Sequence, residues 1–180
     1  MKKIFTVLLV FLSASVSLLA QNEASLKIEV QNGTLKFDGK AVTPHWKTRV
    51  VTGSLTGTPR VELKSNKLYT FDRYGLVVFE KPLNGEGSGD INELQVFFST
   101  PGDTDGIKPA RPYPGIFTIE GCTVTGSTDL ATLRSKLAGY TEGEGYKANM
   151  YKFSKNNFYL YLFFDEEDKK LIRLSMGKDD

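Results

Sequence analysis

Short runs of alternating apolar and polar residues recur along the chain after residue 25. Two of these runs, at residues 35–42 and 117–124, are each interrupted by an acidic residue and a glycine, Asp38-Gly39 and Glu120-Gly121. Alternation with a period of two predicts strands that bury one face, and glycine tolerates the positive φ of a two-residue hairpin turn. The sequence therefore predicts two β-hairpins that lie far apart in the chain.

Each predicted hairpin is followed by a stretch with a helical period. Leu130, Leu133 and Leu137 stand at i, i+3 and i+7, which places them on one face of a helix. The counterpart at residues 46–55 is a weaker helix, because Gly53 and several β-branched residues lower its helical propensity. We expect one short amphipathic helix after each hairpin.

Three apolar runs close each half of the chain and predict a three-stranded antiparallel meander. They lie at residues 67–71, 76–81 and 91–99 in the first half, and at residues 148–153, 158–164 and 171–176 in the second. A further alternating run at residues 25–30 has no counterpart in the second half. It predicts one extra leading strand.

The two halves match when the sequence is shifted over itself by 82 residues. The matched positions are turn glycines and core-type residues: Gly33, Gly39, Val42 and Thr43 fall on Gly115, Gly121, Val124 and Thr125. This match indicates a tandem duplication. We predict an α+β fold of two repeats, residues 21–98 and 115–180, joined by a Pro- and Gly-rich linker at 99–114. Each repeat is a hairpin, a helix and a three-stranded antiparallel meander, with the helix packed on one sheet face.

The predicted strand at residues 158–164 is apolar on both faces. Its two alternating sets are Phe158, Leu160, Leu162 and Phe164, and Tyr159, Tyr161 and Phe163. Alternate residues share a face, so both faces of the strand need a cover. The cover over the tyrosines is the other repeat, a second copy of the chain or a partner. Rows of Tyr and Phe suit both protein interfaces and sugar stacking, so the candidate binding residues are Tyr159, Tyr161, Phe163 and Trp46.

The first 20 residues have the layout of a secretory signal peptide. Lys2 and Lys3 precede an apolar run at residues 4–16, and small residues lead to Ala20. The run is shorter than the ~20 apolar residues of a membrane-spanning helix, although an uncleaved anchor is the alternative. We expect cleavage after Ala20 and export to the periplasm or the extracellular space.

Removal of this segment also changes the charge of the chain. The whole sequence carries 23 basic and 21 acidic residues, and loss of Lys2 and Lys3 leaves 21 of each. A chain without net charge lacks the field that holds a phosphate backbone. We therefore expect no nucleic-acid partner.

Residues that carry catalysis and metal binding are scarce. His45 is the single histidine and Cys122 the single cysteine, which excludes a multi-histidine metal site and an intrachain disulfide. Cys122 is either a small apolar residue or a link to another chain. The sequence GDTDG at 102–106 starts like a calcium loop but lacks the later ligands, and residues 165–168 are typical of a solvated turn. We expect no cofactor, no metal and no enzymatic activity.

Two resemblances bear on these expectations. The duplicated pattern, with LYTFDRYGL at residues 68–76 leading into a meander, resembles uncharacterised repeat domains of exported bacterial proteins. The order of helix and then meander, found twice, is similar to that of the beta-lactamase inhibitory proteins and the small outer-membrane assembly lipoproteins. Those folds begin each unit with two helices instead of a hairpin. The resemblance implies a protein-binding role and transfers no site residues.

The sequence thus predicts an exported, non-enzymatic protein-binding module of the inhibitor, immunity or envelope-assembly type. Its partner is another exported or envelope protein, bound on the sheet face opposite the helices. A carbohydrate-binding module that uses the same aromatic face is the alternative. A hydrolase with paired carboxylates is a second alternative, because such pairs are defined by their separation in space. We expect no stable membrane span, and the oligomeric state stays open.

Overall fold

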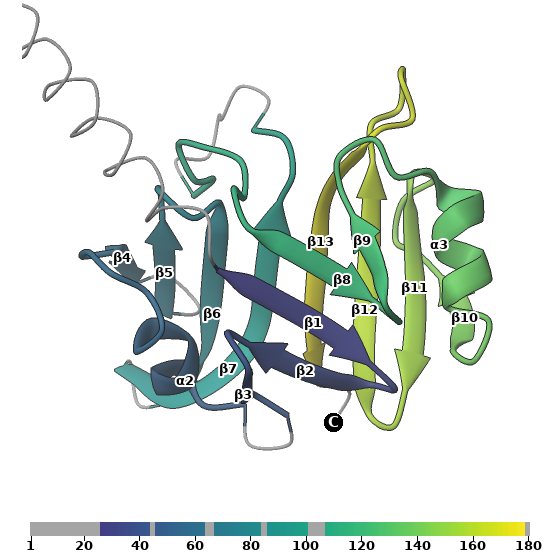
Figure 1. Cartoon of the computed structure of the whole chain (residues 1–180). Helices are drawn as coiled ribbons and strands as arrows, with labels where there is room; N and C mark the ends of the chain where they lie inside the picture. Colours follow the sequence, from purple (N-terminus) through teal and green to yellow (C-terminus); the bar gives the residue numbers. More distant parts are fainter. Residues whose placement is uncertain (1–25, 44–45, 64–66, 84–85, 101–106, 179–180) are drawn as a thin grey trace, which may run out of the picture.

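Two β-sheets make up most of the molecule. The computed structural model describes residues 26–43, 46–63, 67–83, 86–100 and 107–178, and these hold thirteen strands and two short helices. A small sheet lies across one face of a large sheet, and its strands run obliquely over those beneath (Figure 1). Within the described residues, no helix is long and apolar enough to cross a membrane.

The large sheet contains eight antiparallel strands, four from each half of the chain. They are β4 (Arg60–Leu63), β5 (Lys67–Phe71), β6 (Leu76–Leu83), β7 (Glu86–Phe97), β10 (Thr141–Glu144), β11 (Met150–Lys155), β12 (Phe158–Phe164) and β13 (Leu171–Lys178). Their order is β10-β11-β12-β13-β7-β6-β5-β4. The last strands of the two halves, β7 and β13, pair at the centre, where Leu94 lies opposite Met176. The two halves therefore form one continuous sheet.

The small sheet is built from the two hairpins and the leading strand. Its strands are β1 (Lys27–Gln31), β2 (Thr34–Phe37), β3 (Lys40–Ala41), β8 (Ile116–Ile119) and β9 (Cys122–Val124), in the order β3-β2-β1-β8-β9. β1 pairs antiparallel with β2 and parallel with β8, so it joins the two hairpins. Asp38-Gly39 and Glu120-Gly121 have the positive φ of the predicted hairpin turns. Both hairpins and the leading strand are confirmed.

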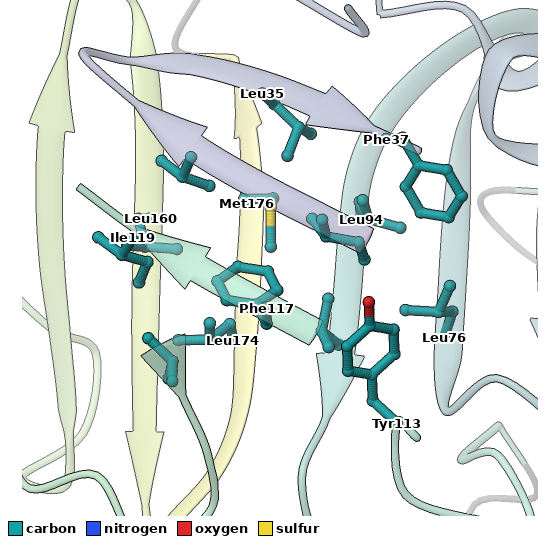
Figure 2. Packing of buried hydrophobic residues seen from close by; sticks show 14 of the residues in the cluster. Leu35, Phe37, Leu76, Leu94, Tyr113, Phe117, Ile119, Leu160, Leu174 and Met176 are labelled. Atoms are coloured by element: carbon teal, nitrogen blue, oxygen red, sulfur yellow. The ribbon is translucent and has the colours of Figure 1, made fainter. Parts of the chain in front are cut away.

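The core lies between the two sheets. Figure 2 shows Phe37 from β2 and Phe117 from β8 projecting toward Leu94 and Leu174 of the large sheet. Along β1 and β8, buried residues alternate with more exposed ones, as in a sheet with one face on the core. Residues of both halves belong to the same buried cluster, so the halves share one core.

The predicted α+β fold is wrong, because the helices do not cover the large sheet. α2 (Thr48–Thr52) has 5 residues and α3 (Leu130–Lys136) has 7, and they lie on either side of the small sheet (Figure 1). Leu133 and Leu137 do pack into the core. Helices this short present too few apolar side chains to cover an eight-stranded face. The small sheet covers that face instead, and the protein is mostly β.

The order of elements in the first half recurs in the second. β2-β3-α2-β4-β5-β6-β7 is followed by β8-β9-α3-β10-β11-β12-β13. β2 begins at Thr34 and β8 at Ile116, and α2 begins at Thr48 and α3 at Leu130, so both pairs start 82 residues apart. The duplication inferred from the sequence, with its repeat boundaries, stays a prediction.

The chain that connects the halves is pinned to the large sheet. The Asp72 carboxylate accepts hydrogen bonds from Arg60 Nε and from the Ala110 N–H, both at 2.8 Å. These bonds, that from Arg60 above all, hold the pKa of Asp72 below its ordinary value. Burial raises the pKa of the Tyr113 hydroxyl, which donates to the Leu26 carbonyl at 2.9 Å. Residues 107–114 of the predicted linker are therefore packed against the fold.

Candidate functional site

Tyr159, Tyr161 and Phe163 lie on the face of the large sheet that is turned away from the small sheet. Their neighbours along β12 are buried in the core between the sheets: Phe158, Leu160, Leu162 and Phe164. Alternate residues of a strand face opposite sides of its sheet. We call the three residues the aromatic row and the face that carries them the outer face. The structure thus brings three of the four candidate binding residues together.

The rings of the aromatic row are tilted relative to one another. The planes of Tyr159 and Tyr161 meet at 60° with centroids 5.3 Å apart, and those of Tyr161 and Phe163 meet at 51° with centroids 6.4 Å apart. Tyr146, which is 83% exposed, lies with its ring 5.7 Å from that of Tyr161. Tyr161 is only 9% exposed, and its hydroxyl donates to the Tyr146 hydroxyl at 3.3 Å. The row therefore has a buried centre and partly exposed ends, and the exposed Tyr146 lies beside it.

Two cationic side chains lie over the aromatic row. Lys152 Nζ is 5.7 Å from the ring centroids of both Tyr159 and Tyr161. The guanidinium carbon of Arg173 is 4.0 Å from the ring centroid of Phe163, and all three contacts are cation–π interactions. Burial lowers the pKa of Arg173, while Glu93 opposes this shift. The row thus combines aromatic area with positive charge.

A glycine sets the position of one end of the row. Gly177 on β13 pairs with Tyr159, and a Cβ at Gly177 would collide with the Tyr159 ring. The same Cβ would lie 2.6 Å from the Asn92 carbonyl oxygen, which accepts a hydrogen bond from the Tyr159 hydroxyl at 3.4 Å. The Tyr159 side chain therefore lies over Gly177 and along the sheet, which leaves no room for a side chain at residue 177.

The chain itself covers part of the outer face in the first half. Leu68, Val77 and Phe97 form a second, small apolar cluster, and Ile107 packs against it. Thr70 Oγ1 donates to the Ile107 carbonyl at 3.1 Å, which holds this cover in place. These residues belong to β5, β6 and β7, so the cover lies on the opposite half of the sheet from the aromatic row on β12.

Trp46 does not belong to the outer face. It is buried in the core and packs on Phe158, with ring centroids 6.1 Å apart and planes 25° apart. A ring in this position fills the space between the sheets and is closed to a ligand. The structure therefore removes Trp46 from the candidate binding residues.

The remaining candidates lie apart from the aromatic row or outside the described residues. His45 and the GDTDG stretch at 102–106 lie outside them. Cys122 is a free, partly exposed thiol on β9. The Asp165 carboxylate accepts the N–H groups of Glu167 and Asp168 at 2.8 and 3.1 Å, which is the geometry of a turn. Within the described residues, no group of three or more ligating side chains is arranged to hold a metal ion.

Sequence reasoning missed two cavities beside the short helices. One, of about 450 Å³, lies next to α3 and is lined in part by Leu130, Tyr151 and Phe164. The other, of about 600 Å³, lies next to α2 and is lined in part by Thr48, Tyr69 and Glu80. A signal was present in the sequence, because Glu80 follows Leu76 and Val78 at a position where the alternation places a core residue.

Residues 27–134 match a family model described as a domain of unknown function (DUF7738). The matched region runs from β1 into α3, and so includes β4 to β7 of the large sheet. Neither the curated proteins nor the solved structures yield a match to the chain. The family model spans 108 of the 180 residues (27 to 134), so the chain belongs to the family of DUF7738 domains of unknown function.

Proposed function

We propose that this protein is a non-enzymatic protein-binding module whose partner binds the aromatic row on the outer face. The observation that supports the proposal most is the group of tyrosine and phenylalanine rings beside two cations, on the sheet face opposite the small sheet. Aromatic residues and arginine are enriched at protein interfaces, and a few of them supply most of the binding energy. An inhibitor, immunity or envelope-assembly role is compatible with such a surface.

The geometry of the row favours a protein over a sugar as its ligand. A sugar ring stacks on the open plane of an aromatic side chain. Here the rings are tilted by 51° and 60° from one another, and Lys152 and Arg173 lie over them. A protein partner can place side chains between and beside the tilted rings. It therefore fits this surface better than a flat sugar ring does.

The charges on the row indicate the chemistry of the partner surface. Lys152 and Arg173 contribute positive charge over apolar rings, and complementary charges orient partners and speed their encounter. We therefore expect the partner to present carboxylates around an apolar centre. Tyr146, at the exposed edge of the row, would contact the same surface.

Affinity capture from an envelope extract of the source organism tests the proposal, with the chain from residue 21 onward as bait. The double variant Tyr146→Ala, Lys152→Glu is expected to weaken the captured complex about 30-fold or more, because truncation of a hot-spot residue removes about 2 kcal/mol of binding free energy. Isothermal titration calorimetry with the purified partner measures the dissociation constant.

Val61→Ser is the matched control. Val61 is exposed on β4, at the other end of the same sheet, so its replacement should leave the dissociation constant unchanged. Circular dichroism verifies that both variants are folded. A partner that binds the double variant as tightly as the parent contradicts the proposal, and so does equal weakening by Val61→Ser.

Export is the second part of the proposal. It rests on the basic start, the apolar run and the small residues within residues 1–20. A chain expressed with this segment in a bacterial host is expected in the periplasm or medium with Gln21 as its first residue. Intact-mass spectrometry of each fraction measures this, and a full-length chain in the cytoplasm contradicts it.

A further inference from the structure

The larger of the two cavities combines two buried polar side chains. It has a volume of about 600 Å³, within the range of small-molecule sites, and lies between α2, the edge of β5 and β6, and the start of β7. Glu80 is 4% exposed and Thr48 is 6% exposed, and both line the cavity. It is separate from the aromatic row, since Glu80 belongs to the core-facing set of β6 and the row lies on the outer face.

The buried Glu80 carboxylate lies beside Lys67, its cross-strand partner on β5. Its Oε2 accepts a hydrogen bond from the Tyr69 hydroxyl at 3.1 Å. Gly87 leaves the space for this carboxylate, because a Cβ at Gly87 would collide with Oε2 and lie 2.5 Å from Cδ. A buried carboxylate is stabilised by each further donor that reaches it. The remaining acceptor positions suit donors that a ligand would bring.

Thr48 is a second, independent indication of a hydrogen-bonding ligand in this cavity. Its Oγ1 is completely buried and has no hydrogen-bond partner, although buried hydroxyls nearly always have one. Thr48 is the first residue of α2 and lines the cavity together with Glu80. A ligand hydroxyl in this cavity would satisfy both groups.

The second half of the chain shows that the fold does not require polar residues here. In the cavity beside α3, the first helical residue is Leu130, where α2 has Thr48. Tyr151 there contacts the ring of Phe164 edge-on, whereas Tyr69 donates to Glu80. An apolar pair thus fills the same place in the second half. The fold alone therefore does not explain why Thr48 and Glu80 are polar, and ligand binding is an explanation for them.

The charges around the cavity select the class of ligand. Lys47, which forms an ion pair with Asp90, and Arg49 line the cavity. Lys67 Nζ lies 5.4 Å from the ring centroid of Tyr69. These cations disfavour an ammonium ligand, and the buried Glu80 carboxylate disfavours an anion. A neutral ligand with several hydroxyl groups is repelled neither by the cations nor by the Glu80 carboxylate.

We infer that this cavity binds a neutral polyhydroxylated ligand, such as one sugar unit of a glycan. Two neighbouring hydroxyls of the ligand donate to the Glu80 carboxylate, and one accepts from or donates to Thr48 Oγ1. Pro59 supplies an apolar wall for the carbon face of the sugar. The inference does not depend on the aromatic row, so either proposal stands if the other fails.

Titration of the isotope-labelled chain with methyl glycosides tests the inference. The probes are the methyl glycosides of glucose, galactose, mannose, fucose and N-acetylglucosamine. At least one is expected to cause saturable NMR shifts of the backbone amides of Thr48, Ser88 and Gly89, which line the cavity. Glu80→Gln should weaken this binding about ten-fold or more, because hydrogen bonds to a charged group contribute about 1.5–3 kcal/mol.

Glu166→Gln is the matched control, since it makes the same chemical change at the cavity beside α3, and it should leave the affinity unchanged. Thr48→Val should weaken binding and also raise the melting temperature by about 2–4 °C, because it removes an unpaired buried hydroxyl. If Glu80→Gln fails to fold, the glycoside affinity of Thr48→Val tests the inference instead. The inference is overturned if no glycoside binds, if ethylammonium binds better, or if neither Glu80→Gln nor Thr48→Val weakens binding.

Discussion

Replacement of Gly75 by alanine is expected to lower the free energy of unfolding by about 2–5 kcal/mol. Gly75 has a φ of 61° in the turn between β5 and β6, and an L-residue there loses about 1–2 kcal/mol. Its Cβ would also lie 2.5 Å from the Pro112 carbonyl carbon and 2.7 Å from the Tyr113 Cα. These are backbone atoms that cannot rotate away, so relief requires a shift of the connecting chain, at about 1–3 kcal/mol.

Gly39→Ala separates the two contributions to this loss. Gly39 has a φ of 75°, but a Cβ there would meet nothing within 4 Å. The Gly39→Ala variant should therefore lose only the free energy that comes from the unfavourable positive φ, about 1–2 kcal/mol. Urea unfolding of both variants, analysed at constant m-value, measures the difference. Equal losses would contradict the close packing of residues 112–113 on the Gly75 turn.

Replacement of Phe117 by alanine is expected to lower the free energy of unfolding by about 3–5 kcal/mol. Phe117 is fully buried between the sheets (Figure 2) and meets the ring of Phe98 edge-on at 5.9 Å. Removal of its ring leaves a cavity at the centre of the core, because the strands around it cannot collapse into the space. Since both halves contribute to this core, unfolding should remain a single transition.

Ile116→Ala is the control for this variant. Ile116 is the preceding residue on β8 and is 50% exposed on the other face of the small sheet. Its replacement should therefore lower the free energy of unfolding by only about 0.5 kcal/mol. Thermal unfolding followed by circular dichroism and by tyrosine fluorescence measures both variants. Two separate transitions, or similar losses at 116 and 117, would contradict the shared core.

Several elements could be predicted from the sequence because their causes are local. The turns at Asp38-Gly39 and Glu120-Gly121 need positive φ, and the flanking alternation defines both strands of each hairpin. The period of Leu130, Leu133 and Leu137 likewise marks α3. These signals depend on residues within one turn or one strand of each other, so no knowledge of distant partners was required.

The candidate site on the outer face could be predicted in part from the sequence. Alternation along residues 158–164 placed Tyr159, Tyr161 and Phe163 on one face, which the structure shows to be the outer face. The contribution of Tyr146, which contacts Tyr161 from outside β11 and β12, has no periodic signal. Trp46 looked equally suitable as a platform, but its burial on Phe158 depends on packing between the sheets.

Local patterns in the sequence were enough to specify the two hairpins, the leading strand, three strands of the large sheet in each half and the two helices, whereas the edge strands β4 and β10 were not predicted. Which element covers which face was decided only in three dimensions. The leading strand β1 pairs with hairpins that begin 82 residues apart (Thr34 and Ile116), and the resulting sheet, not the helices, buries the apolar face. Hydrogen bonding along strand edges and burial of area are non-local, so the pairing of distant strands leaves no periodic trace in either segment.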